Sequence, residues 1–320
     1  MKLGVLIAFG VLAGVMSLFV GALHIPIAEI IPALFGRGDA VHVSIVQDLR
    51  APRTLLALVI GAGLGASGAA LQGYTRNPLA DPGILGFSAT AALGAVSALY
   101  FGLSTLVVPA ALIGAGLGAV VLLGLAGRRQ GATVLILAGV GIGSLATALT
   151  GLLMNFAPNP WALSEIVYWL MGSLRNASFD AAILCAVLTV MGLLSLFWVA
   201  PDLRTLSLGE ETAQSLGVSL PRVRLLLVMG VALCVGAGVA VAGAIGFVGL
   251  FVPHILRFIF GADPARLVPL SAIGGAGFLA LAEVLTRVIT SNGKVLYLGI
   301  LSALIGAPFF VWLAFKAGRT

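Results

Sequence analysis

The sequence predicts an all-α, polytopic membrane protein with about ten transmembrane helices. Charged residues make up only 9% of the 320 residues, far fewer than a soluble protein of this length needs to cover its surface. The mean hydropathy is +1.17, and several apolar runs reach about 20 residues, enough for a helix to cross the ~30 Å hydrocarbon core of a bilayer. The 43 glycines are typical of apolar helices whose backbones pack closely.

The expected spans follow the apolar runs in chain order. The first begins after Lys2, and its run of about 21 apolar residues exceeds the ~7–15 of a signal peptide, so we interpret it as an uncleaved span. The eighth is short and contains Pro253, which interrupts helical hydrogen bonding. No linker divides the chain, so residues 1–320 are expected to form a single domain. The predicted spans are 3–23, 51–73, 84–103, 106–126, 132–154, 180–200, 222–243, 245–260, 266–288 and 296–315.

The basic residues lie at the ends of the apolar runs. With the N-terminus inside, 11 of the 17 Lys and Arg residues fall on the inner side and 6 on the outer side. Because cytoplasmic loops are enriched in Lys and Arg, both termini are expected to be cytoplasmic. The basic residues form no continuous patch of the kind that binds nucleic acid, so no nucleic-acid partner is expected.

Three connections between the expected spans are longer than a turn. Residues 24–50 and 155–179 lie outside, and the second of these contains a short amphipathic stretch after Pro160. Residues 201–221 lie inside, bounded by proline at both ends. Within them, residues 210–216 are expected to form one or two helical turns, which acidic residues at the start would favour.

The stretch RNPLADPGILG, residues 76–86, separates the second and third apolar runs. Its prolines interrupt the helical hydrogen-bond ladder and its glycines let the chain turn, so it cannot be regular helix. At membrane depth, backbone of this kind is tolerated only where protein or a water-filled path satisfies its polar groups. The stretch is therefore expected at a pathway or at its mouth.

An intramembrane protease is one alternative. Ser67 lies in GASG within the second run and resembles the serine motif of rhomboid proteases, which pair their serine with a histidine. The histidines are His24 and His42 in the first outer loop and His254 near the inner face. The helix count does not suit rhomboids, so we interpret Ser67 as a packing residue.

Metal and nucleotide sites are not expected in this chain. The sequence contains neither HExxH nor CxxC, and Cys185 and Cys234 lie inside apolar runs as small core residues. A P-loop needs glycine, lysine and then serine or threonine, but the only lysine after a glycine is Lys294, followed by Val295. Any ATP hydrolysis must therefore occur in another chain.

Glu283 and Arg287 lie one helical turn apart in AEVLTR. An acidic residue within a span is a functional candidate by default, but an i,i+4 ion pair near the outer face explains this one more simply. The scarcity of further carboxylates within the spans argues against a proton-driven pump. A secondary transporter is nevertheless kept as a second alternative.

Four stretches closely resemble one family. They are LRAPRTLLALVIGAGLGASGAALQGYTRNPLADPGILGFSATAALGA, LSLGEETAQSLGV, AGAIGFVGLFVPHILR and LSALIGAPFFVWL. They are similar, in the same order and over nearly the whole chain, to the permeases of bacterial ABC importers for ferric siderophores, haem and cobalamin.

The resemblance implies the architecture of a type II ABC importer. In that family the permease has ten helices and forms a homodimer or pseudo-dimer around a central pathway. Two ATPase subunits, which bind ATP and Mg, attach inside, and a periplasmic binding protein docks outside. On this basis residues 1–320 are expected to form a single transmembrane permease domain of a homodimer in the bacterial inner membrane, with no enzymatic activity and no cofactor of its own.

The resemblance also assigns candidate functional residues. A cytoplasmic gate is implied at two segments near the inner mouth, GFSAT (Gly86–Thr90) and RRQGAT (Arg128–Thr133), and a coupling segment to the ATPase in the long inner loop. Outer-face arginines would pair with glutamates of the binding protein, which would require Pro52 to hold Ala51 extended so that the neighbouring guanidinium groups face outward. The gate residues are Gly86, Phe87, Ser88, Ala89, Thr90, Gly131, Ala132 and Thr133. The coupling residues are Gly209, Glu210, Ala213, Leu216 and Gly217, and the docking residues are Arg50, Arg53 and Arg287.

Two departures from the family pattern bear on docking and substrate. Val295 stands where the family usually has glutamate before the last helix, and no second histidine follows His254, which lowers haem as a candidate. From the breadth of the family, a ferric siderophore is the leading substrate, with cobalamin next and haem third.

Overall fold

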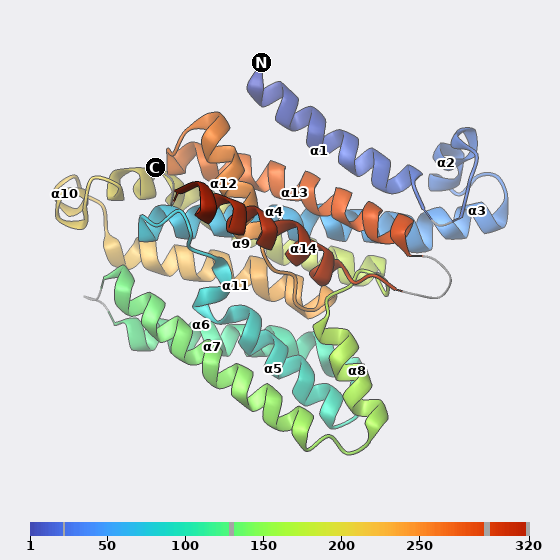
Figure 1. The fold of residues 1–320 in the computed structure, drawn as a ribbon, viewed down its shortest axis with the longest axis horizontal. Coiled ribbons are helices and arrows are strands. Elements are labelled where there is room, and N and C mark those ends of the chain that lie inside the picture. Colours follow the sequence, from blue (N-terminus) through green and yellow to red (C-terminus); the bar gives the residue numbers. More distant parts are fainter. Residues whose placement is uncertain (22, 128–130, 291–294, 318–320) are drawn as a thin grey trace.

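The computed structural model describes residues 1–21, 23–127, 131–290 and 295–317, and within these ranges every regular element is a helix (Figure 1). The predicted all-α fold class is confirmed. The long helices are α1 Lys2–Phe19, α4 Ala51–Thr75, α5 Phe87–Tyr100, α6 Val107–Ala126, α7 Ala132–Asn155, α9 Phe179–Leu206, α11 Leu220–Ala242, α12 Val248–Phe260, α13 Pro264–Ile289 and α14 Leu298–Ala317. The short ones are α2 Ile27–Leu34, α3 Ala40–Ser44, η1 Ile45–Arg50, η2 Pro82–Leu85, η3 Ser104–Leu106, α8 Pro160–Leu170 and α10 Glu210–Ser215.

Each of the ten predicted spans contains a long helix. Among the described residues, seven helical segments are long and apolar enough to cross a membrane, by length and composition. The apolar helices α5, α12 and α14 are shorter. The predicted short helices in the loops, α8 after Pro160 and α10 in the inner loop, are also present.

Helices α4 and α13 pack against each other along the centre of the molecule. A Cβ added to Gly61 would lie 2.2 Å from the carbonyl oxygen of Gly275, and one added to Gly65 would lie 2.1 Å from that of Ser271. The small-residue spacing of Gly61 and Gly65 therefore lets the two backbones touch. Around this pair, α1 lies on α13, while α5, α6, α7 and α8 form a second group that α11 joins to the centre (Figure 1).

The first outer connection is more helical than the sequence predicted. Over residues 24–50, for which no helix was predicted, the chain forms α2, α3 and a π-helical turn, η1, which continues into α4 as one helical segment from Ala40 to Thr75. The expectation that Pro52 holds Ala51 extended is wrong, because Ala51 is α-helical with φ −63° and ψ −49°. The Ala51 N–H bonds to the Val46 carbonyl, five residues back, so the hydrogen-bond register shifts just before the proline, which has no N–H.

Two other predicted boundaries moved. Helix α9 continues through Pro201 to Leu206, so this proline does not end the sixth span. Residues 245–247, assigned to the start of the eighth span, are not helical: Phe247 has φ +68°, and α12 begins only at Val248. Gly243, the last residue of the predicted seventh span, follows α11 with φ +71°. Pro253 lies within α12, in its second turn, without ending it.

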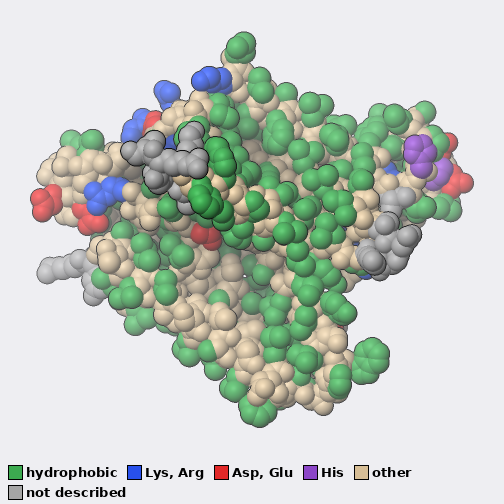
Figure 2. Space-filling view, in the orientation of Figure 1, with side chains coloured by type: hydrophobic (Ala, Val, Ile, Leu, Met, Phe, Trp, Pro, Cys, Tyr) green, Lys and Arg blue, Asp and Glu red, His purple; other side chains and the backbone are tan. Residues whose placement is uncertain are grey.

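Apolar side chains cover much of the surface. On the face shown in Figure 2, most charged side chains gather toward the end that carries α10 and the start of α1, and toward the end that carries α2 and α3. Hydrophobic side chains cover most of the surface between these two ends. This distribution suits a molecule whose middle faces lipid and whose two ends face water.

Candidate functional site

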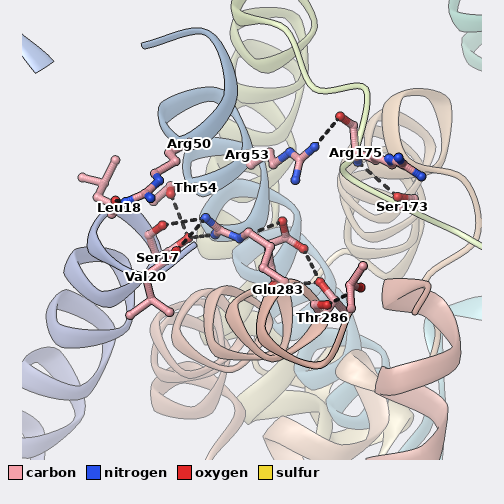
Figure 3. A network of polar contacts seen from close by, with 12 residues as sticks. Ser17, Leu18, Val20, Arg50, Arg53, Thr54, Ser173, Arg175, Glu283 and Thr286 are labelled. Atoms are coloured by element: carbon pink, nitrogen blue, oxygen red, sulfur yellow. Dashed lines mark hydrogen bonds and ion pairs between the residues drawn. The ribbon is translucent and has the colours of Figure 1, made fainter. Parts of the chain in front are cut away.

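Arg50, a predicted docking residue, is buried at the end that carries α2 and α3. Only 4% of the residue is exposed, and Figure 3 shows it beside Leu18. Its guanidinium donates hydrogen bonds to the carbonyl oxygens of Leu18 (3.1 Å), Phe19 (2.8 Å) and Leu23 (2.6 Å). These carbonyls lie at and just beyond the C-terminal end of α1, where helical hydrogen bonding stops. Arg50 therefore caps α1 with a positive charge, which also favours the helix dipole.

Arg287, the second predicted docking residue, caps the same helix from α13. It is 8% exposed, forms an ion pair with Glu283 (Nε to Oε1, 3.2 Å), and donates to the carbonyls of Ser17 (2.9 Å) and Val20 (3.2 Å). The predicted i,i+4 pair with Glu283 is thus confirmed. Glu283 also accepts a hydrogen bond from the Thr286 hydroxyl, so the buried carboxylate is well satisfied.

Arg53, the third predicted docking residue, is half-buried. Its Nη2 donates to the carbonyl of Arg175 (2.7 Å), and the two arginines line a small cavity of about 140 Å³ with Ser173 and Glu283 (Figure 3). Burial of Arg50 and Arg287 leaves Arg53, with Arg175, as the basic pair best placed to meet a partner. A role in docking stays a prediction for these residues.

At the opposite end, residues 76–86 form a compact turn after α4. Arg76 ends α4 in the left-handed conformation (φ +52°), and the Asp81 carboxylate accepts from the N–H of Gly83 (2.8 Å) to start η2. Gly86 has φ +83°, and a Cβ there would lie 2.8 Å from the Gly139 carbonyl of α7. The prolines and glycines of this stretch thus fold it against α7, where other residues would be strained.

Sequence reasoning missed Gln72, which holds this turn in place. Its side chain is buried and donates from Nε2 to the carbonyls of Ala80 (3.3 Å) and Gly249 (3.4 Å), and its Oε1 accepts from Arg257 of α12 (3.0 Å). One amide therefore links α4, the turn and α12. The signal in the sequence was a lone amide inside an otherwise apolar helix.

The predicted gate residues border cavities beside this turn. Ser88 lines a cavity of about 210 Å³ and Ala89 an open one of about 620 Å³, and Asp81 borders both. Phe87 is fully buried, and Thr90 is partly exposed. In the second segment, Gly131 is the N-cap of α7 and is followed by Ala132 and Thr133, whereas Arg128 and Arg129 lie outside the described residues.

The predicted coupling residues lie on and around α10. Gly209 precedes the helix with φ +111°, and Gly217 follows it with φ +91°, conformations that favour glycine. Leu216 is 63% exposed, whereas Ala213 is fully buried and packs against this chain. Ala213 is therefore not exposed for a partner in the way the resemblance implied, whereas Leu216 presents an exposed apolar side chain. A coupling role for these residues stays a prediction.

The structure gives no support to protease or metal chemistry. Ser67 is fully buried, and in the described part of the chain no hydrogen bond joins it to His254, whose ring lies against Phe258, Phe309 and Phe310. The described residues also contain no group of three or more His, Cys, Asp or Glu side chains that could hold a metal ion.

Comparison with known proteins decides the family. Residues 8–316 match the FecCD transport family. The chain belongs to this family. One FecCD relative, the vitamin B12 import system permease protein BtuC of Vibrio vulnificus, is 36% identical, with 94% of this chain and 91% of that protein covered. Another, the cobalamin import system permease protein BtuC of Halobacterium salinarum, is 40% identical, covering 90% of this chain and 77% of that protein.

Two further FecCD-like proteins extend the comparison. The uncharacterized ABC transporter permease protein YvrB of Bacillus subtilis is 35% identical, with 95% of this chain and 90% of that protein covered. A solved inward-facing structure of an ABC transporter of the metal-chelate type superposes with a TM-score of 0.88 and 31% identity, covering 98% of this chain and 99% of that one. As a FecCD family member, this chain is a multi-pass membrane permease of the ABC importer type.

Proposed function

We propose that this chain is the permease subunit of an ATP-driven importer that carries cobalamin, or a similar chelated metal compound, into the cytoplasm. The observation that carries the proposal is the FecCD match over residues 8–316 in a sequence without a P-loop. Because the chain lacks the residues that cradle ATP phosphates, ATP and Mg must be bound by a partner ATPase. The N- and C-termini and α10 then face the cytoplasm.

Cobalamin takes first place among the substrates because of the relatives. Permeases named for vitamin B12 or cobalamin import are 36% and 40% identical to this chain over most of its length. This exchanges the first two places in the order expected from family breadth: a ferric siderophore is now second, and haem stays third. The cavities that Ser88 and Ala89 border are mostly apolar, which suits a pathway that holds substrate weakly.

The two ends of the molecule suggest where the ATPase and the binding protein would bind. Leu216 and the glycines around α10 offer a small apolar contact to an ATPase, and Arg53 with Arg175 offers positive charge to an acidic binding protein. A second copy of the chain completes the pathway. The exposed apolar face of α14, with Leu304, Trp312 and Phe315, is available for that contact.

Uptake by proteoliposomes tests the substrate. The permease is reconstituted with the ATPase and the binding protein encoded beside it, and radiolabelled cobalamin, a ferric siderophore and haem are compared at equal concentration. The proposal expects ATP-dependent accumulation of cobalamin above the other two. If the siderophore or haem accumulates and cobalamin does not, the substrate assignment is wrong while the importer function stands.

A further inference from the structure

Helix α2 carries an apolar stripe that no described residue covers. Ile27, Ile31 and Phe35 follow one another at intervals of four residues and are 72%, 59% and 75% exposed. Residues four apart lie on one face of a helix, so these side chains form one continuous surface, the α2 stripe, at the end of the molecule that carries α2 and α3. Exposed apolar residues are ordinary when scattered, whereas an aligned stripe marks a contact surface.

The neighbouring face of α2 is packed and fixes how the helix is turned. Ile30 and Ala33, 2% and 0% exposed, pack with the fully buried Val46 of η1. Gln47 donates from Nε2 to the Leu34 carbonyl (3.0 Å) and so holds the C-terminal end of α2 against the same segment. The exposure of the α2 stripe is therefore a consequence of the fold and does not come from a loosely attached helix.

Helix α2 lies at the level where a bilayer surface is expected. The 18 residues of α1 make a helix about 27 Å long, close to the thickness of the hydrocarbon core, so its end at Phe19, which Arg50 caps, marks the edge of that core. The segment Ala40–Thr75, with 36 residues, is about 54 Å long and passes this edge. Val46, which α2 covers, comes one helical turn before Arg50 and lies roughly 6 Å beyond the edge. The polar layer of a bilayer is roughly 5–7 Å thick on each side, so α2 lies within it.

The α2 stripe adjoins a surface that faces lipid. Only 17% of the apolar window of α1 is buried, and Leu12 and Met16 are 61% and 45% exposed, as expected for a helix at the edge of a membrane protein. Phe19, the last residue of α1, packs against the cluster under α2. In Figure 1, α2 lies beyond this end of α1 and away from α5, α6, α7 and α8. A lipid-facing surface therefore leads directly to the stripe.

The charges around α2 argue against the binding protein as the occupant of the stripe. Residues 24–49 contain three acidic residues, Glu29, Asp39 and Asp48, and one basic residue, Arg37. A binding protein that presents glutamates to Arg53 would meet like charge here, which costs affinity. A phospholipid surface needs only the apolar stripe.

We propose that α2 is an interfacial helix, whose Ile27, Ile31 and Phe35 side chains enter the boundary between the phospholipid headgroups and the acyl chains at this end of the molecule. In the proposed orientation this is the periplasmic leaflet. The three side chains bury apolar area in lipid, and α2 in turn anchors η1 beside the membrane surface. The inference goes beyond the proposed function and holds for any substrate.

The experiment places a spin label on Ile31→Cys or Phe35→Cys in the full chain, in vesicles of phosphatidylethanolamine and phosphatidylglycerol. Collisions with oxygen, which concentrates in hydrocarbon, are compared with collisions with a water-soluble nickel chelate. The native Cys185 and Cys234 are buried and stay unlabelled. Two matched controls are Leu12→Cys on the lipid-facing surface of α1 and Ser44→Cys, an exposed polar position on α3.

The ratio of oxygen to nickel collisions decides between the occupants. Both stripe labels are expected to give a ratio about tenfold above that of Ser44→Cys and close to that of Leu12→Cys, because a polar chelate is excluded from an apolar environment. Adding the binding protein is expected to leave these ratios unchanged.

Two results would overturn the inference. Stripe labels that collide with nickel as often as Ser44→Cys face water, and protection from nickel by the binding protein would then make the stripe a docking surface for that protein. Stripe labels that collide rarely with both reagents are covered by protein, as in a contact with a second copy of the chain. Both stripe positions are exposed, so the cysteine variants are expected to fold, and if one fails to fold the other decides.

Discussion

Two of the three arginines expected at the outer surface are buried in helix capping. Arg50 from η1 and Arg287 from α13 converge on the carbonyls that end α1, and each is satisfied by backbone oxygens. Their position beside the ends of spans could be predicted from the sequence. Their burial could not, because it depends on where the end of α1 lies in space.

Arg50→Gln and Arg53→Glu should have different effects. Arg50→Gln is expected to lower stability by about 2 kcal/mol because buried α1 carbonyls lose a charged donor. Arg53→Glu is expected to leave stability and basal ATPase activity unchanged but to weaken docking of the binding protein, with a salt-sensitive association rate. Thermal unfolding in detergent and binding kinetics measure the two effects.

The exposed Arg37 supplies a control for docking, since Arg37→Glu makes the same charge change on the same side. If Arg37→Glu and Arg53→Glu weaken docking equally, the effect of Arg53→Glu comes from the general charge of this surface and not from a specific contact of Arg53. Replacing the partner glutamate of the binding protein by a basic residue should partly restore docking to the Arg53→Glu variant but not to the Arg37→Glu variant.

Asp263, between α12 and α13, gives a pH-dependent contribution to stability. Arg204 donates to both of its carboxylate oxygens (2.8 and 2.6 Å), and these bonds lower the pKa of Asp263 below its ordinary value. Because the folded-state pKa is depressed, the contribution is complete above the unfolded pKa of about 3.9 and is lost as pH falls through the lower, folded value. Wild type should therefore unfold at a higher temperature than Asp263→Asn at pH 7, and the gap should close as pH falls through the lowered folded-state pKa of Asp263. A gap that is independent of pH would contradict this.

At the scale of elements, hydrophobic runs located every long helix, while helix ends were harder to predict. Pro201 lies inside α9 and Pro253 inside α12, because proline removes one hydrogen bond without always ending a helix. Residues 245–247 were assigned to a span yet are not helical, and Phe247 is left-handed, since contacts with neighbouring helices, not local sequence, decide their conformation. The turn 76–86 was predictable because its prolines and glycines exclude helix.

Helix α10 gives a prediction about coupling. Gly217 has φ +91° and open space around it, so Gly217→Trp adds about 1 kcal/mol of backbone strain without a clash in this chain. It is expected to insert and fold but to obstruct the ATPase contact, so that uptake falls while residual ATP hydrolysis continues. Paired uptake and ATPase assays measure this, and normal uptake with Gly217→Trp would remove α10 from the coupling role. Ala213 is a poor test site because its burial would turn a large substitution into a packing defect.

The gate assignment predicts a nucleotide-dependent cross-link. Cysteines that replace Ser88 on two copies of the chain should cross-link across the pathway in one nucleotide state and not in the other. The same holds for Thr133, whereas a cysteine at the exposed Leu137 on α7 serves as a control. If the cross-linking yield does not depend on nucleotide, these segments are ordinary packing contacts and do not form a gate.

For the whole molecule, fold and family were predictable and the polar interior was not. Composition and motif order led to a FecCD-type permease, which the match over residues 8–316 confirms. Gln72 and Arg224, whose guanidinium donates to the Ala126 carbonyl, escaped sequence reasoning, because a single polar residue in an apolar run gains meaning only from what surrounds it in space. Both are buried, and a buried polar group needs specific polar contacts.

The energy source is the most direct test of the account. Proteoliposomes that contain the permease alone, or the permease with its ATPase and binding protein, are supplied either with ATP inside or with a proton or sodium gradient, and cobalamin uptake is measured. The account predicts accumulation only with the complete importer and ATP. Accumulation by the permease alone, driven by an ion gradient, would make the chain a secondary transporter and contradict the central claim.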